Sequence, residues 1–167
     1  LIIGALLFLV AAGLTLIFGV LGVVNFAHGS LYMLGAYLAL TVFRATDSFL
    51  AAALGAGFGV ALFAVVFERL FMRRVYGTDV LMQLLVCYAF ILILDDVVKI
   101  VWGGEFLSMG MPEAFQSPPF FVGGGVVPVF YLFLMIVAVA IALLLWWVLR
   151  FNKVGKTVRA AAQNPTM

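Results

Sequence analysis

Four residues that could bind a ligand stand close together inside an apolar stretch: Asn25, His28, Gly29 and Ser30. Side-chain hydrogen bonds are available from the Asn25 amide and the His28 imidazole. From Leu1 to Phe43 the chain contains no Asp, Glu, Lys or Arg. Polar groups at membrane depth are costly unless they are buried in protein or line an aqueous cavity. The pattern therefore indicates a functional site within or close to a membrane.

The same residues interrupt a stretch that would otherwise form one helix. Leu1–Phe43 as a single helix would be about 65 Å long, about twice a hydrocarbon core of about 30 Å. A new helix that begins at Gly29 or Ser30 would direct free N–H groups and its positive dipole end at a substrate carboxylate. The alternative is a tight turn between two spans, in which Asn25 caps the next helix and His28 binds a backbone carbonyl.

The composition places the whole chain in a membrane. It is 67% hydrophobic and 10% charged, and its mean hydropathy is +1.30, more than a soluble domain needs to fill its core. One His, one Cys and no Gly-Lys-Ser/Thr phosphate loop leave little for an enzyme or a metal site. We therefore expect no catalytic residues, cofactor, metal or nucleic-acid partner. The first residue is Leu, so we expect a chain that is incomplete at both ends.

The lengths of the hydrophobic stretches predict an all-α protein, a polytopic transmembrane helical bundle with an interrupted helix near residues 25–30. A span needs about 20 apolar residues. Polar residues at 44–48, 68–79 and 103–125 are expected to form loops. A single transmembrane domain is thus predicted, with spans at about 1–24, 29–43, 49–68, 80–101 and 126–149 and a cytoplasmic segment at 150–167.

Small residues recur every four positions in the third of these stretches, at Ala51, Gly55 and Gly59. Such a face allows another helix to approach closely. We expect tight helix packing there and no role in substrate binding.

Charged residues near the end of the fourth stretch allow two interpretations. Asp95 and Lys99 are four positions apart and can form an ion pair on one helix face. The pair could be an interfacial one beside an anchoring Trp102, or a relay or gate inside the membrane. With the interfacial interpretation, no acidic residue lies near mid-span, which argues against a proton- or sodium-coupled transporter.

The basic residues predict the orientation of the chain. Cytoplasmic loops of membrane proteins carry an excess of Lys and Arg. Two of the polar segments hold seven of the nine basic residues, so we expect these segments in the cytoplasm and the long loop at 103–125 outside. The seven are Arg69, Arg73, Arg74, Arg150, Lys153, Lys156 and Arg159.

Three stretches together resemble one family. Gly13–Tyr37, Glu68–Gly77 and Val154–Pro165 are similar to the membrane permease subunits of branched-chain amino-acid ABC importers, in the family's order and at about its spacing. One departure is Ser30, which stands where an acidic residue is common. The family's chain continues through several more spans, so the resemblance implies a truncated permease.

The resemblance implies a function and a set of partners. The chain would be the permease subunit of an importer for branched-chain amino acids in the bacterial inner membrane. It would work with ABC ATPase subunits, a second permease subunit and a periplasmic substrate-binding protein. It would not be an enzyme, because ATP hydrolysis would reside in the ATPase. Urea or a short amide is the alternative substrate, and a membrane scaffold without a transport path is the alternative from another functional class.

Two sets of residues take roles through this resemblance. Asn25, His28, Gly29 and Ser30 would belong to the substrate pathway. The C-terminal segment would form a short amphipathic helix that docks on the ATPase, unless it is an ordinary basic flank that only fixes topology. The residues expected to couple to the ATPase are Lys156, Val158, Arg159, Ala161 and Ala162.

Overall fold

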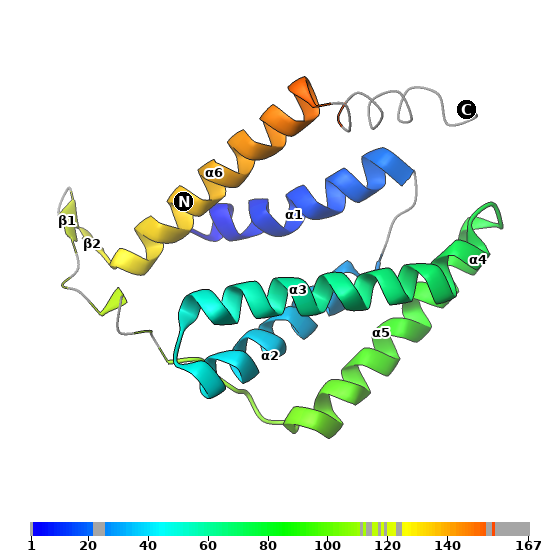
Figure 1. Cartoon of the computed structure of the whole chain (residues 1–167), viewed down its shortest axis with the longest axis horizontal. Coiled ribbons are helices and arrows are strands. Elements are labelled where there is room, and N and C mark those ends of the chain that lie inside the picture. The colour runs from blue at the N-terminus through cyan, green and yellow to red at the C-terminus, as the bar shows by residue number, and fades with distance from the viewer. Residues whose placement is uncertain are drawn as a thin grey trace. The chain divides into compact units, whose positions relative to one another are not determined.

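The computed structural model is helical, as predicted, and contains one small β-hairpin (Figure 1). It describes residues 2–21, 26–110, 112, 115–116, 118, 120–122, 125–152 and 155. The chain divides into two compact units, residues 25–112 and the remainder. The elements are α1 (Ile2–Leu21), α2 (His28–Thr46), α3 (Phe49–Phe67), the π-helical turn η1 (Glu68–Met72), α4 (Arg73–Val75), α5 (Val80–Trp102), β1 (Phe120–Val122), β2 (Gly125–Val127) and α6 (Val129–Phe151).

Two helices are long and apolar enough to cross a membrane. They are Phe49–Val75, with 27 residues, and Val129–Phe151, with 23 residues; the most apolar 18 residues of each have a mean hydropathy of 2.3 and 2.9, respectively. Only 6% of the most apolar part of each is buried. An apolar helix that buries so little of itself is not the core helix of a soluble protein, so these surfaces suit contact with lipid. The assignment of all five predicted spans stays a prediction.

The predicted interruption is present. Helix α1 ends at Leu21 and α2 begins at His28, with Phe26 and Ala27 in a turn between them. Neither helix alone reaches the length of the 43-residue apolar stretch, so the stretch forms two helices.

Within the 25–112 unit, α2 and α3 pack closely through small residues. A Cβ atom placed at Gly55 would lie 3.1 Å from Val42 Cγ2, and one placed at Gly59 would lie 2.9 Å from Leu38 Cδ1. Ala52 and Ala56 of α3 are buried beside them. The predicted close packing at Gly55 and Gly59 is therefore confirmed, and α2 is the helix that approaches.

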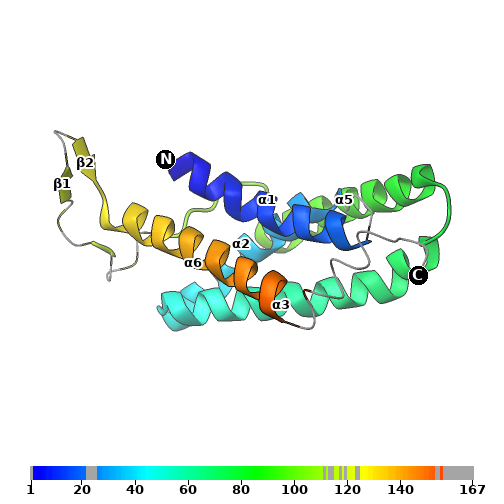
Figure 2. The same cartoon turned by 90° about the horizontal axis from the view of Figure 1, so that it is seen from above.

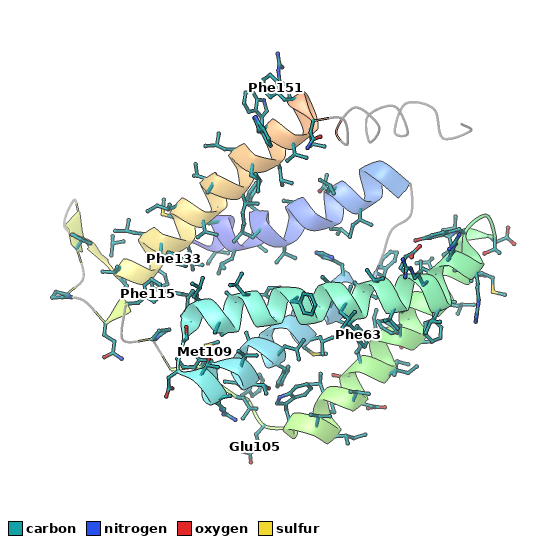
Figure 3. All side chains as sticks on the ribbon, in the orientation of Figure 1. Phe63, Glu105, Met109, Phe115, Phe133 and Phe151 are labelled. Atoms are coloured by element: carbon teal, nitrogen blue, oxygen red, sulfur yellow. The ribbon has the colours of Figure 1, made fainter. Side chains whose placement is uncertain are left out.

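Helix α5 begins beside η1, diverges from α3 and contacts α2 (Figures 1 and 2). The ring of Phe90 stacks on that of Phe67 with centroids 3.6 Å apart, and it also meets Phe63 at 5.7 Å. Figure 3 shows Phe63 on the side of α3 where α2 and α5 lie. The buried face of α5 consists of Cys87, Phe90, Leu94 and Val98.

The polar loop predicted from Glu68 to Asp79 is mostly helical, which corrects the prediction. Helix α3 continues through η1 and α4 to Val75, and the chain turns only at residues 76–79. Charge ends a membrane span but does not end a helix, because Arg and Glu are good helix formers. The turn comes at Gly77, whose φ of +84° favours glycine.

The second unit contains α1, α6 and the hairpin. Helices α1 and α6 contact one another. Strands β1 and β2 pair antiparallel, with Phe120 opposite Val127. The ring of Phe115 lies 5.0 Å from that of Phe133 at the start of α6 (Figure 3). The segment predicted as an irregular loop thus contains a short piece of regular structure.

Candidate functional site

The predicted pathway residues lie at the first turn of α2. His28 and Ser30 are partly buried, whereas Gly29 is exposed, and a Cβ atom placed there would meet no atom within 4 Å. Ala27 is the N-cap residue, and its methyl side chain cannot accept a hydrogen bond from the first turn. Asn25 lies outside the described residues. Ala27 is fully buried, so the described part of this site combines an open position at Gly29 with a buried one two residues earlier.

The packing of α2 on α3 shows at which level of the unit this helix start lies. Gly35 faces Val60, and the two helices run antiparallel. His28 precedes Gly35 by seven residues in α2. In antiparallel helices it therefore lies opposite the residue that follows Val60 by about seven positions in α3, which is Phe67. Charged residues of the helix begin directly after Phe67. With the orientation predicted from the basic residues, His28 lies close to the cytoplasmic end of the α3 span.

A second polar site lies on α5. Lys99 Nζ forms an ion pair with a carboxylate oxygen of Asp95, as the spacing predicted. Both side chains remain about half exposed, at 56% for Lys99 and 47% for Asp95. Asp96 is exposed as well and acts electrostatically on Lys99. Two negative charges and one positive charge thus lie on the outer surface of the helix.

The contacts of α5 show that these charges lie at the depth of an uncharged helix. Phe90 packs on Phe63 and Phe67 of α3. At the other end, Trp102 contacts the part of α2 that packs against Gly55 and Gly59. The residues between Phe90 and Trp102 are therefore level with residues 55–67 of α3, all within its chargeless stretch.

The interfacial and the intramembrane interpretations of the Asp95–Lys99 pair both stay predictions. An Asp or Lys at the centre of a membrane helix costs about 2.5–3.5 kcal/mol. Three such groups facing lipid would cost roughly 8–10 kcal/mol before pairing, comparable to the whole stability of a typical protein, about 5–15 kcal/mol. An intramembrane position would therefore require a polar partner on this face of α5.

Trp102 is held by α2 and is not a free interfacial anchor. Its indole Nε1–H donates to Thr41 Oγ1 at 2.8 Å, and its ring lies 5.3 Å from that of Tyr37. Thr41 Oγ1 in turn donates to the carbonyl of Tyr37 at 2.9 Å. These bonds fix the end of α5 against the middle of α2.

Beyond Trp102 the chain passes α2 and forms with it an open, mostly apolar pocket of about 260 Å³. Leu107 and Met109 are partly buried on this crossing. Sequence reasoning missed the cavity, because the segment was predicted only as an irregular loop and its contact with α2 is tertiary. The cavity is lined by Ala36, Tyr37, Ala39, Leu40, Phe106, Leu107 and Met109.

The turn between α4 and α5 is ordered by local contacts. Thr78 Oγ1 donates to the carbonyl of Val75 at 2.7 Å, and Cys87 Sγ lies 3.9 Å from Met72 Sδ. Partial burial raises the pKa of Tyr76 above its ordinary value, with smaller contributions from Glu68 and Cys87. The predicted coupling residues Lys156, Val158, Arg159, Ala161 and Ala162 lie outside the described residues.

Nothing in the described part of the chain suggests a metal centre: no group of three His, Cys, Asp or Glu side chains is placed to hold an ion there. Among the described residues of the 25–112 unit, polar side chains gather at the start of α2 and on the exposed face of α5.

Comparison with known proteins gives a consistent result. The family described as "Branched-chain amino acid transport system / permease component" matches residues 1–167. The high-affinity branched-chain amino acid transport system permease protein LivH of Salmonella typhimurium is 26% identical over 173 residues, which cover 95% of this chain and 55% of LivH. LivH of Escherichia coli K12 gives the same values. BraD of Pseudomonas aeruginosa is 25% identical over 176 residues, 99% of this chain and 57% of BraD.

The chain therefore spans about half the length of the curated relatives it matches. No solved structure matches it significantly.

Proposed function

The chain belongs to the permease component family of branched-chain amino acid transport systems, and from this membership we propose that it forms part of an ATP-driven importer of branched-chain amino acids. The observation that carries the proposal is the family match over the whole length of an apolar chain. Permeases of this family are non-catalytic membrane subunits. The proposed location is the bacterial inner membrane, and the proposed partners are ABC ATPases, a second permease subunit and a periplasmic binding protein.

The proposed pathway includes the start of α2, with Asn25, His28, Gly29 and Ser30. The open surface at Gly29 supports this role, because a solute can approach the backbone there. The positive end of the helix dipole at the start of α2 favours a carboxylate. The packing of α2 on α3 supports a position at the cytoplasmic exit of the path.

The pathway is tested by uptake of labelled leucine into proteoliposomes that contain the complete transporter. The Asn25→Ala, His28→Ala double variant should lower uptake at least about tenfold, since two charge-free hydrogen-bonding groups are worth about 1.4 kcal/mol or more together. Thr46→Ala is the matched control, because Thr46 is polar and exposed at the other end of α2 and makes only local bonds, to the Val42 carbonyl and from the Ser48 N–H. Uptake by the double variant at the rate of the control would overturn the pathway role.

Substrate class is tested in the same vesicles. Unlabelled isoleucine and valine should compete with leucine, and urea or acetamide should not. Competition by the amide alone would favour the alternative substrate class, and absence of any substrate-stimulated ATP hydrolysis would favour the scaffold.

A further inference from the structure

Gly155 is packed against the end of α6. The helix ends at Phe151, and Asn152 leaves it with an extended backbone, at φ −85° and ψ 153°. Arg150, Phe151 and Asn152 are exposed, whereas Gly155, three residues later, is buried. The chain therefore turns back at once after the helix instead of running on into solvent.

This contact is made with backbone atoms and has room only for glycine. A Cβ atom placed at Gly155 would lie 2.5 Å from Leu149 Cα and nearer still to the carbonyl oxygens of Val148 and Leu149. Non-bonded carbon atoms prefer separations of about 3.5–4.0 Å. The close contacts of the other described glycines are with side chains, which can rotate aside, but helix backbone cannot. Any other residue at position 155 would push the chain away from α6.

We propose that Gly155 is a positioning residue for energy coupling, because it holds the start of the C-terminal segment on the last turn of α6. This inference rests on the proposed function, since the residues expected to couple to the ATPase begin at position 156. A slack connection would absorb a displacement of that segment. A glycine packed on helix backbone transmits the displacement to α6, because close-packed groups resist compression.

Helix α6 leads from this contact toward the proposed pathway. It contacts α1 within the same unit. Helix α1 ends at Leu21, four residues before Asn25. Rigid helices in contact carry coupling between distant sites. Gly155 therefore begins a continuous route from the C-terminal segment to the interruption before α2.

The experiment compares Gly155→Ala with Gly57→Ala in proteoliposomes of the complete transporter. Both variants add one methyl group, but a Cβ atom placed at Gly57 would meet no atom within 4 Å. Leucine uptake and ATP hydrolysis are measured in the same vesicles. Gly155→Ala should lower the leucine transported per ATP hydrolysed at least about fivefold, since coupling between two sites is typically about 5–150-fold. Basal ATP hydrolysis should continue, and Gly57→Ala should keep the parent ratio.

Trypsin digestion measures the contact itself, independently of transport. Lys153 and Lys156 flank Gly155 and are cleavage sites. Cleavage of a locally opened segment follows its open population, so it should be at least about fivefold faster in Gly155→Ala than in the parent and in Gly57→Ala. A second variant, with two glycines inserted between Asn152 and Lys153, loosens the connection without adding a side chain, and its uptake per ATP should fall as well.

Two results overturn the inference. Unchanged cleavage at Lys153 and Lys156 in Gly155→Ala would mean that Gly155 does not hold the segment on α6. An unchanged ratio of uptake to hydrolysis in Gly155→Ala, or in the insertion variant should Gly155→Ala not assemble, would mean that the contact plays no part in coupling. A parent transporter that takes up no leucine would refute the proposed function instead, and the digestion would still decide whether the contact exists.

Discussion

The glycines of α3 allow a prediction in which the shortest contact is not the most costly one. Gly57 faces open space, Gly59 faces the end of the Leu38 side chain, and Gly55 faces the branched side chain of Val42. All three lie inside the same helix. Replacement by Ala lowers the backbone entropy of the unfolded chain equally at each position, so it should raise the free energy of unfolding by the same amount, about 0.5–1 kcal/mol. Differences among the three variants isolate the steric cost of packing.

Gly57→Ala should stabilise the protein by that gain alone. Gly55→Ala places a methyl group 3.1 Å and 3.4 Å from the two Cγ atoms of Val42 and 3.6 Å from its Cβ. Val42 is stiff about χ1, so the helices must separate, at an overpacking cost of about 1–3 kcal/mol. Gly59→Ala gives a shorter contact, 2.9 Å to Leu38 Cδ1, but the next atom is 4.0 Å away. A leucine methyl can rotate aside, so the steric cost of Gly59→Ala should lie between those of Gly57→Ala and Gly55→Ala.

The assay is thermal unfolding of the purified transporter in detergent. For a chain of this size, 1 kcal/mol shifts the midpoint by about 2–4 °C, so Gly55→Ala should unfold about 2–12 °C below Gly57→Ala. In the Gly55→Ala background, Val42→Ala should recover part of the loss, because the two residues are in contact. Equal midpoints for Gly55→Ala and Gly57→Ala, or the lowest midpoint for Gly59→Ala, would refute the described packing of α2 on α3.

Two further changes test the end of α5 and the C-terminal segment. Trp102→Phe and Thr41→Val each remove the 2.8 Å hydrogen bond between α5 and α2. Each variant should lower the free energy of unfolding by about 1 kcal/mol. In a double-mutant cycle measured by unfolding, the double variant should lose less than the sum of the two single losses, because both changes remove the same bond. Additive losses would mean that this bond does not hold α5 in place. Arg159→Glu should uncouple ATP hydrolysis from uptake without preventing membrane insertion. The control is Arg44→Glu, in the last turn of α2, which should leave coupling intact. Unchanged coupling in proteoliposomes for Arg159→Glu would contradict docking of the C-terminal segment on the ATPase.

Much of the fold follows from the lengths of the apolar stretches. A helix of about 20 residues matches a bilayer, and this rule places the helices and the interruption between Leu21 and His28. The spacing of Gly55 and Gly59 predicts close packing, because only a small residue admits another helix. The sequence does not say which helix approaches; that depends on the tertiary arrangement of α2 and α3.

The helix end at Val75 could not be predicted for a different reason. Arg73 and Arg74 mark the end of the apolar surface, which is a statement about the membrane. Backbone hydrogen bonds continue as long as residues favour a helix, and the side chains of Arg remain in water beyond the lipid. The glycine at position 77 is the better signal for the turn.

The contact that Trp102 makes could not be predicted from the sequence. Tryptophan is enriched at membrane interfaces, so its position after Asp95 and Lys99 suggests an interfacial anchor. In the structure the Trp102 indole is used within the unit, as a donor to Thr41 Oγ1. Thr41 lies 61 residues earlier in the chain, so this bond depends on the tertiary arrangement of α2 and α5.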